Sequence, residues 1–429
     1  MVRFIFEAFS KVVDLVVAFY LANPRLLLII VVGAVFLFHY LHNVVQKPLL
    51  FSPNGPFRWF LCSNCSTISE KYWPTIWCYP THLHTPLATI LRGLLPELKY
   101  HREYIQTPDG GQISLDWYDP NGDGKRCQIN HCTSQVHADS EKPIALFMPG
   151  VTGCSQAEYL KTFVPIAHQI GYRAVAINYR GMGNTELLTP RLYCGANDED
   201  LRTALLHIRS SNPNAKIVAT GISLGGIILS RYLISSGHDS LVDAAYLVSV
   251  VWNYLEVISN MEKGLNYQLN RFLTKSLIGI VQQHRDKFQN LPQYDLEAVQ
   301  RCRTMREFDD AFTIRMFNYE STTEYYTACI PKGKMINIKK PTLCINAADD
   351  MFAPGEMLPI DEVEMNSFVA MLVTSRGGHI GFMDGFLPNL THSYMERILE
   401  QYLTALIKLP DFRCDLTNSI NTQNNYNQY

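Results

Sequence analysis

Short apolar runs recur along the chain and are separated by segments of helical periodicity. The first run alternates apolar and polar side chains, as a half-buried strand does, and the later ones are almost continuously apolar. The runs are 113–118, 144–148, 172–178, 216–222, 244–250, 342–346 and 368–374. Helical patterns lie between them, for example over 201–209 and 225–235. Short apolar strands that alternate with helices predict an α/β fold, in which helices cover both faces of a mostly parallel central sheet.

One long interval breaks this alternation. Residues 252–339 show no convincing strand pattern and are rich in Leu, Phe, Tyr, Arg and Gln at helical spacing. We interpret this interval as a helical cap that is inserted over the mouth of the sheet. Ordinary helices on a face of the sheet are the alternative.

The N-terminal region contains a run long enough for a membrane helix. Residues 26–38 read LLLIIVVGAVFLF, and with neutral histidines following, the helix extends to about twenty residues before Lys47, the length that crosses a bilayer. A cleaved signal peptide would carry its apolar region nearer the start of the chain, with a small-residue cleavage site after it. The position of the run therefore favours an uncleaved anchor over a signal peptide or a buried core helix.

The charges beside this run indicate an orientation. Lys and Arg gather on the cytosolic side of membrane helices. Arg3, Lys11 and Arg25 precede the run, whereas Lys47 and Arg58 follow it. By this small margin we expect a single-pass protein of type II, with its N-terminus in the cytosol and its bulk in the lumen of the endoplasmic reticulum or another endomembrane.

The chain is expected to divide into four consecutive parts. They are a membrane anchor at 1–50, a Pro- and Trp-rich connector at 51–98, an α/β domain with its cap at 99–410, and a polar tail at 411–429. A second apolar run in the first part, 12–22, carries Asp14 and suits an interfacial rather than a spanning helix. The tail has the composition of a disordered segment.

Charge and cysteine content exclude several classes of protein. The 429 residues carry a net charge of −2 and no block of Lys or Arg, so we do not expect a nucleic-acid partner. The 11 cysteines are scattered, unlike the framework of a small disulfide-rich domain. Cys62 and Cys65 form a CxxC pair that only Cys127, His131 and Cys132, in a polar stretch, could complete as a zinc site. We therefore expect neither a metal nor a cofactor.

A GxSxG sequence runs from Gly221 to Gly225. It follows the apolar strand KIVATGI and opens the apolar helix GGIILSRYLI. A serine in this context sits on a tight strand-to-helix turn with its hydroxyl exposed, and small neighbours are needed because the turn leaves no room for Cβ atoms. The helix N-terminus behind it favours developing negative charge. Ser223 is therefore the predicted nucleophile.

A serine nucleophile needs a base, and the base needs an orienting acid. The loop RGGHIGF follows the strand VAMLVTS and contains His379, the predicted base. The loop AADDMFAP follows the strand TLCIN and offers Asp349 and Asp350. We prefer Asp350, because the segment from Asp350 to Pro354 has the D-x-apolar-x-P shape that is usual for such a loop. Asp349 would instead brace the loop.

The negative oxygen of a tetrahedral intermediate is stabilised by two N–H groups that donate hydrogen bonds to it. The amide of Leu224, directly after the nucleophile, is the first candidate. The second should come from the loop Pro149–Gly153, where we choose Val151, with Thr152 as the alternative. These amides are the predicted oxyanion hole.

The motifs together resemble a known family. The segments PGVTGCSQAEYLKTF, NYRGMGNTELLTPRLYCGANDEDL, GISLGG, NAADDMFAP and TSRGGHIGF are similar to those of the alpha/beta hydrolase domain-containing proteins of the 1/3 subgroup, within the AB hydrolase 4 family. The resemblance covers about 51–409. It implies an α/β-hydrolase fold, a single-pass membrane protein with phospholipase or carboxylesterase activity, and a triad of Ser223, Asp350 and His379.

These observations predict a membrane-anchored serine hydrolase that cleaves carboxylic esters of lipids, with glycerophospholipids such as phosphatidylcholine as substrates. The alternatives are a general carboxylesterase or monoacylglycerol lipase, an acyltransferase, and a lipid or ligand binder without turnover. HIGFMD at 379–384 spells the HxxxxD pattern of acyltransferases. The cap offers apolar residues for an acyl-chain slot, namely Leu255, Phe272, Leu277, Ile280, Phe312 and Phe317. It also offers cations for a lipid phosphate, namely Lys263, Arg271, Lys275, Arg285, Arg301, Arg303 and Arg306.

Overall fold

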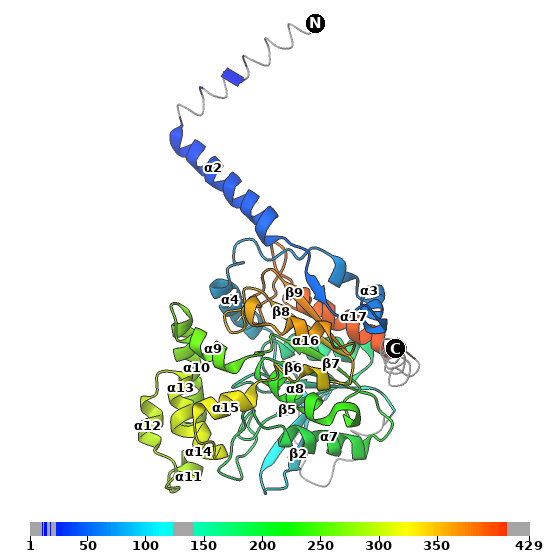
Figure 1. Ribbon diagram of the computed structural model, residues 1–429, viewed down its shortest axis with the longest axis vertical. Coiled ribbons are helices and arrows are strands. Elements are labelled where there is room, and N and C mark those ends of the chain that lie inside the picture. Colours follow the sequence, from blue (N-terminus) through cyan, green and yellow to red (C-terminus); the bar gives the residue numbers. More distant parts are fainter. Residues whose placement is uncertain (1–10, 12, 15–17, 19–22, 123–140, 410–429) are drawn as a thin grey trace. The chain divides into compact units, whose positions relative to one another are not determined.

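The computed structural model describes residues 11, 13, 14, 18, 23–122 and 141–409. Cys127, His131 and Cys132, most of the apolar run 12–22 and the polar tail lie outside these residues. The chain forms two compact units, Met1–Gln46 and Lys47–Tyr429. The second unit is called the catalytic body below (Figure 1).

The catalytic body is built on one nine-stranded sheet with the order β1-β9-β8-β7-β6-β4-β5-β3-β2. The strands β4 to β9 run parallel, whereas β1, β2 and β3 pair antiparallel with their neighbours. The strands are β1 Leu49–Phe51, β2 Tyr100–Gln106, β3 Gln112–Tyr118, β4 Ile144–Met148, β5 Arg173–Asn178, β6 Ile217–Ile222, β7 Ala244–Val248, β8 Thr342–Ala347 and β9 Val369–Thr374. The predicted mostly parallel sheet is thereby confirmed, and each of the seven predicted runs overlaps one of these strands.

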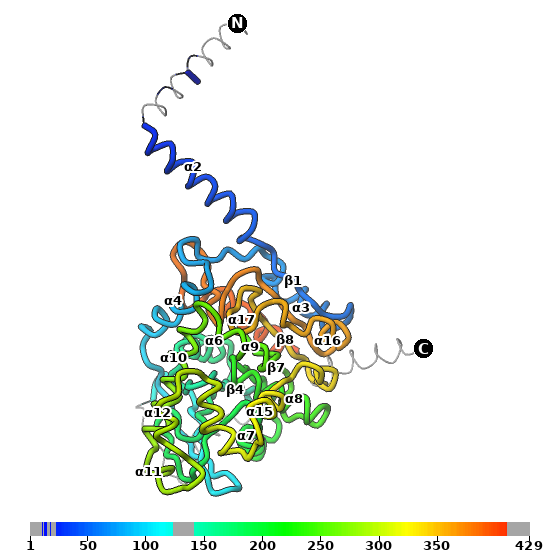
Figure 2. Tube along the Cα trace, turned by 60° about the vertical axis from the view of Figure 1, so that its left-hand side comes forward, coloured from blue at the N-terminus to red at the C-terminus, as the bar shows by residue number. Residues whose placement is uncertain are grey.

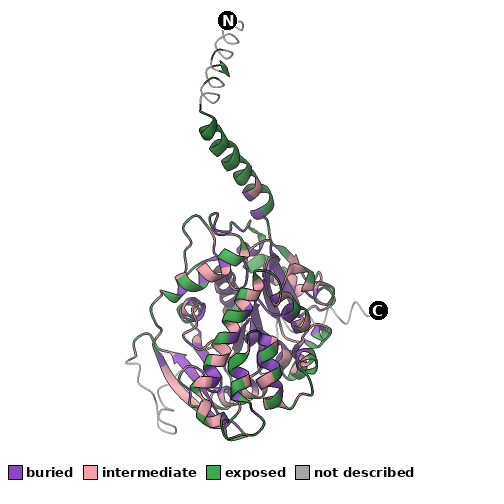
Figure 3. Cartoon of the chain, turned by 90° about the vertical axis from the view of Figure 1, so that its left-hand side faces the viewer, coloured by how far each residue is buried: buried purple, intermediate pink, exposed green. Residues whose placement is uncertain are grey.

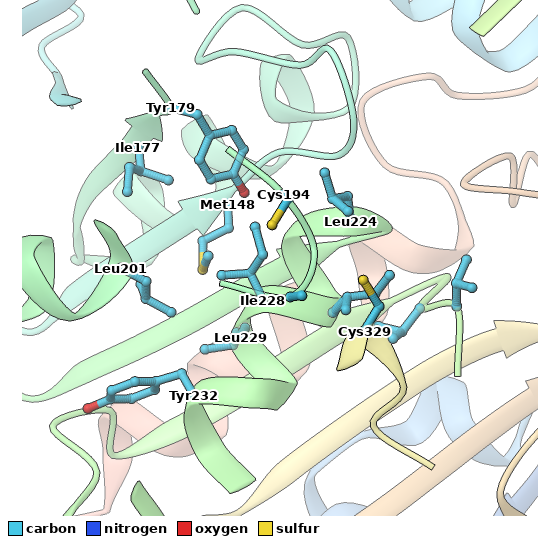
Figure 4. Packing of buried hydrophobic residues seen from close by; sticks show 14 of the residues in the cluster. Met148, Ile177, Tyr179, Cys194, Leu201, Leu224, Ile228, Leu229, Tyr232 and Cys329 are labelled. Atoms are coloured by element: carbon cyan, nitrogen blue, oxygen red, sulfur yellow. The ribbon is translucent and has the colours of Figure 1, made fainter. Parts of the chain in front are cut away.

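Alternate residues of the central strands enter two separate cores, one on each face of the sheet. In β4, Leu146 belongs to one core and Phe147 to the other. Helices α7 Glu199–Ser211 and α8 Leu224–Ser236 cover the first face. Helices α3 Pro56–Asn64, α6 Leu160–Ile170 and α17 Tyr394–Lys408 cover the second. Figure 4 shows part of the first core, where Met148 lies among Ile177, Ile228 and Leu229.

The interval between β7 and β8 is helical, as predicted, and its helices gather on one side of the catalytic body (Figure 1, left). Its α-helices are α9 Tyr254–Met261, α10 Asn266–Gln283, α11 Arg285–Phe288, α12 Leu296–Arg301, α13 Met305–Phe308, α14 Ile314–Phe317 and α15 Thr322–Cys329, with a π turn at Asp309–Thr313. The remaining helices are α4 Thr81–Gly93 and α16 Ile360–Glu364, with 3-10 turns at Ser66–Ser69, Gly237–Asp239, Met335–Asn337 and Gly355–Met357. We call the segment from α9 to α15 the cap.

Two strands were not predicted from the sequence. The strand β1 has three residues, which is too short for a periodic pattern to appear. The strand β2 reads YHREYIQ and lies at the edge of the sheet, where it pairs with β3 over its whole length. An edge strand buries few side chains, so its sequence stays polar. The sequence signal for a hairpin between β2 and β3 was the Asp109–Gly110 pair, because Asp-Gly is typical of tight hairpin turns. In the structure Gly110 has the positive φ, 80°, that such a turn requires.

The first unit contains one apolar helix. The helix α2 spans Pro24–His39, begins with proline in its first turn, and continues as a π turn over Tyr40–Val44. Together they form 21 residues with a mean hydropathy of 2.1, long and apolar enough to cross a membrane. No side chain of α2 is buried, and Figure 3 draws it almost entirely as exposed. A core helix would be mostly buried, so that alternative does not apply.

Candidate active site

Ser223 lies on a sharp turn between β6 and α8. Its φ of 53° and ψ of −116° fall in a strained region for a residue with a Cβ. The turn is possible because a Cβ at Gly221 would lie 2.7 Å from the Cα of Gly226, and one at Gly225 would collide with the Met148 carbonyl oxygen. The Ser223 amide donates to the Val248 carbonyl oxygen at 2.9 Å. The glycines of the motif thus hold the serine where the sheet ends.

Ser223 is hydrogen-bonded to the predicted histidine and aspartate. His379 Nε2 lies 2.9 Å from Ser223 Oγ, and His379 Nδ1 lies 2.8 Å from Asp350 Oδ2. Ser223, Asp350 and His379 follow β6, β8 and β9, respectively. These strands are parallel, so their carboxyl ends lie on the same side of the sheet. An ionised Asp350 accepts a hydrogen bond from Nδ1–H, which leaves Nε2 free to accept the serine proton. The arrangement can therefore activate the serine hydroxyl.

The two adjacent aspartates have different surroundings. Asp350 is fully buried, and its Oδ1 accepts from the Phe352 amide at 2.8 Å. Asp349 contacts the backbone of the loop that contains His379, called the histidine loop below, where its Oδ1 accepts from the amide of the preceding residue, Gly378, at 2.9 Å. Burial, with a smaller contribution from the neighbouring Asp350 charge, raises the pKa of Asp349 to about 6. Asp350 therefore contacts the imidazole ring, whereas Asp349 contacts the backbone of the loop.

Val151 and Leu224 line the cavity that contains Ser223. Within the described residues, neither the Val151 nor the Leu224 amide donates to another protein group. Leu224 is the first residue of α8, and amides in a first helical turn have no partner inside the helix. The Thr152 amide, the alternative considered from the sequence, donates to the Tyr193 hydroxyl at 2.9 Å. This contact favours Val151 over Thr152 as the second oxyanion donor.

The helix α4 is hydrogen-bonded to the histidine loop and to the residues that follow it. No sequence motif predicted this role of α4. Thr85 Oγ1 accepts from the His379 amide at 2.9 Å, and His84 Nε2 accepts from the Met383 amide at 2.7 Å. Arg92, which is buried, donates to the carbonyl oxygens of Ile380 and Gly381 at 2.8 Å each. Burial lowers the pKa of His84 to about 3, so this ring is neutral and can accept.

Two cavities meet at Val151, Leu224, Tyr254 and Met305. The smaller, about 410 Å³ with its open mouth, is lined by Ser223 and by residues of α9 and α10. The larger, about 570 Å³, extends beneath the cap. Its lining includes four of the residues proposed from the sequence for an acyl-chain slot, namely Leu277, Ile280, Phe312 and Phe317. Both cavities are predominantly apolar, as an acyl chain requires.

Two other residues proposed for that slot do not line either cavity. Phe272 is 68% exposed, because it lies on the outer side of α10. Leu255 packs against the core instead. Helical spacing alone does not say which side of a helix faces a cavity, so it could not separate these two residues from the four that line the larger one.

The cations proposed for a lipid phosphate also stay outside both cavities. Arg306 forms an ion pair with Glu262 at 2.7 Å, and Arg285 pairs with Glu297 at 3.4 Å. The remaining five are exposed, namely Lys263, Arg271, Lys275, Arg301 and Arg303. None of the seven is therefore placed to contact a group bound inside a cavity.

A buried carboxyl group lines the larger cavity. Asp309 accepts from the hydroxyls of Thr313 at 2.6 Å and Tyr326 at 3.0 Å. Burial raises its pKa from 3.8 to about 7.

Among the described residues, no group of three or more His, Cys, Asp or Glu side chains could hold a metal ion.

Several known proteins are similar to this chain. The family model for the alpha/beta hydrolase fold matches residues 143–386. The chain is 37% identical to "Phospholipase ABHD3" of Homo sapiens, over 91% of this chain and 93% of the relative. It is 30% identical to "Protein abhd-3.2" of Caenorhabditis elegans, over 88% and 97%. The solved esterase Pf2001 of Pyrococcus furiosus is 16% identical, covers 66% of this chain and 83% of its own, and has a TM-score of 0.40.

Proposed function

The chain belongs to the α/β-hydrolase family, and from this premise we propose that it is a membrane-anchored phospholipase that cleaves glycerophospholipids such as phosphatidylcholine with Ser223, His379 and Asp350. The pair of hydrogen bonds from Ser223 through His379 to Asp350 carries the proposal. The human relative named a phospholipase, which the chain matches over nearly its whole length, supports the substrate class. A membrane anchor is supported by α2.

The geometry supports hydrolysis in two steps. Ser223 Oγ attacks the ester carbonyl carbon while its proton passes to His379 Nε2, and the Val151 and Leu224 amides donate to the negative oxygen. When the C–O bond breaks, His379 returns that proton to the leaving alkoxide, which departs as a lysophospholipid. Water then attacks the acyl-serine ester, His379 takes the water proton and passes it to Ser223 Oγ, and the fatty acid leaves.

Acyl transfer by the HxxxxD pattern is not favoured. That reading requires His379 and Asp384 to act together. His379 Nδ1 contacts Asp350, whereas Asp384 forms an ion pair with Arg397 at 2.7 Å. Non-catalytic binding is not favoured either, because a binder has no use for the strained Ser223 turn beside an oriented histidine.

The proposal includes an orientation and a compartment. Three basic residues, Arg3, Lys11 and Arg25, precede the apolar run 26–38, whereas Lys47 and Arg58 follow it, and this small margin supports a type II arrangement with the N-terminus in the cytosol. The catalytic body would then lie in the lumen of the endoplasmic reticulum or another endomembrane.

Replacing the nucleophile tests the proposal. In purified full-length protein, Ser223→Ala should abolish labelling by a fluorophosphonate probe and lower fatty acid release from phosphatidylcholine in mixed micelles at least about a thousandfold. Ser236→Ala, the same change at the end of α8, is the matched control and should retain both. Full labelling of the Ser223 variant would exclude this nucleophile, and turnover of butyrate esters without fatty acid release from phosphatidylcholine would exclude the lipid substrate.

A further inference from the structure

Six large apolar side chains stand exposed on the catalytic body near the histidine loop. Between 47% and 81% of each side chain is accessible to solvent. They are Trp73, Trp77, Leu265, Phe272, Phe386 and Leu387. Large apolar groups that gather on a surface mark a site of interaction, because isolated ones are common but clusters are not. We call this set the apolar rim.

Printed contacts join the segments that carry the rim. The Trp77 indole N–H donates to the Phe386 carbonyl oxygen at 2.7 Å, and the Gly385 amide donates to the Trp73 carbonyl oxygen at 2.9 Å. His82, in the first turn of α4, contacts the Asn266 side chain at 2.8 Å, next to Leu265. Figures 1 and 2 both show the start of α10 beside α4. The rim is therefore one surface formed by three segments far apart in the sequence.

The same segments reach the active site with their other sides. On α10, Phe272 is exposed, whereas the next residue, Leu273, lines the cavity that contains Ser223. On α4, Thr85 accepts from the His379 amide. Phe386 lies in the loop that continues from His379. A molecule bound at the rim would thus lie on the outer side of elements that border the Ser223 cavity or contact the histidine loop.

Cations accompany the apolar side chains of the rim. Lys263, Arg271 and Lys275 are exposed, and among the described residues none of them forms an ion pair. Arg271 and Lys275 lie on the same outer side of α10 as Phe272. Exposed aromatic and aliphatic groups beside Lys and Arg suit the boundary of a bilayer, where acyl chains meet phosphates. Tryptophan in particular is enriched at this depth.

We propose that the apolar rim docks the catalytic body onto the surface of the bilayer, as a second contact in addition to α2. The inference rests on the proposed lipid hydrolysis, since docking would let a phospholipid pass from the bilayer into the Ser223 cavity. The charge beside the rim favours a lipid surface over an apolar protein partner. A protein partner is the outcome that would contradict the proposal.

The tryptophans of the chain allow a direct test. Of the five, Trp117 and Trp252 are buried, and Trp59 is exposed on α3 and does not belong to the rim. Residues 1–46 contain none, so lipid-dependent quenching reports on the catalytic body alone. Full-length Ser223→Ala protein, which leaves the lipid intact, is reconstituted in vesicles of phosphatidylcholine with brominated acyl chains and in matched unbrominated vesicles.

Bromine should quench the fluorescence, and adding Trp73→Phe and Trp77→Phe should remove most of that quenching. Adding Trp59→Phe instead should leave it in place. Unquenched Trp73 and Trp77, or quenching that disappears with Trp59, would overturn the docking surface. The test does not depend on turnover, so it stands apart from the test of the hydrolase function.

Kinetics provide a second readout in otherwise unchanged protein. Phe386→Ser combined with Leu387→Ser should lower turnover of vesicle phosphatidylcholine about tenfold, since both side chains lose a burial site in lipid. Turnover of a soluble butyrate ester should not change. Leu206→Ser on α7, another exposed leucine, is the matched control and should alter neither. Equal loss of both activities in the double variant, or no loss of phospholipid turnover, would contradict docking through these residues.

Discussion

Asp349 and Asp350 are adjacent in the chain, and only Asp350 contacts the imidazole ring. We expect Asp350→Asn to lower kcat by about ten-thousandfold, because the amide cannot hold the ring in the required tautomer. Asp349→Asn should cost about tenfold or less, because its oxygen can still accept from the Gly378 amide. Fatty acid release by the purified variants, with matched thermal unfolding, measures both. A larger loss at Asp349 would reverse the assignment.

Thr85 positions His379 through its backbone. Thr85→Val keeps the shape of the side chain and removes the acceptor for the His379 amide, which lies 2.9 Å away. We expect kcat to fall about tenfold with little change in KM, since a misplaced base affects the chemical step rather than binding. Thr85→Ser keeps the hydroxyl and should restore most of the rate. If serine and valine behave alike, shape rather than hydrogen bonding explains the role of Thr85.

At the scale of single residues, local sequence motifs were sufficient to predict the three residues of the proposed triad. GISLGG on a strand-to-helix turn, and Asp and His after later strands, predicted Ser223, Asp350 and His379, which the structure brings within hydrogen-bonding distance. Their catalytic roles remain proposals. Thr85 and Arg92 were missed because their partners lie far away in the sequence, 294 residues for Thr85 and 288 for Arg92. A buried Arg and His within an apolar helix, THLHTPLATILRG, was the only signal.

The helix α2 is an element whose role can be tested by removal. Its apolar side chains are exposed throughout, which water disfavours and lipid accepts. Deleting residues 1–46 should therefore move the protein from the carbonate-resistant membrane fraction to the extracted one. Immunoblots of both fractions, with butyrate ester turnover as a check of folding, measure this. A truncated protein that resists extraction at high pH would show that another element is the main anchor.

Among the elements, burial decided which were predictable. The strands β4 to β9 are covered on both faces, so their apolar runs were visible in the sequence. The edge strand β2 and the three-residue β1 left no such pattern. In the cap, the pattern predicted helices but not their orientation. The side chains of Phe272 and Leu273 are consecutive, yet one faces solvent and the other a cavity.

The stability of the whole molecule should depend on Asp309. Burial raises its pKa from 3.8 to about 7, so the folded protein holds a proton there that the unfolded chain releases. The free energy of unfolding should consequently decrease as pH rises from about 4 to about 7 and then level off. Asp309→Asn, whose amide oxygen can accept from one of the two hydroxyls while its NH2 group donates to the other, should flatten this decrease. Thermal unfolding of both proteins across this range measures the difference, and parallel curves would contradict the prediction.

The contacts between α4 and the histidine loop also set a time at which activity can begin. During synthesis, α2 and α4 leave the ribosome first, Ser223 follows midway, and His379 comes close to the end. A nascent chain that already carries α2 and the proposed nucleophile therefore still lacks His379, the proposed base. Because the loop is held by a helix made almost three hundred residues earlier, the proposed site is complete only when α4 and the histidine loop have met. Under the proposed mechanism, an unfinished chain could not degrade the membrane that receives it.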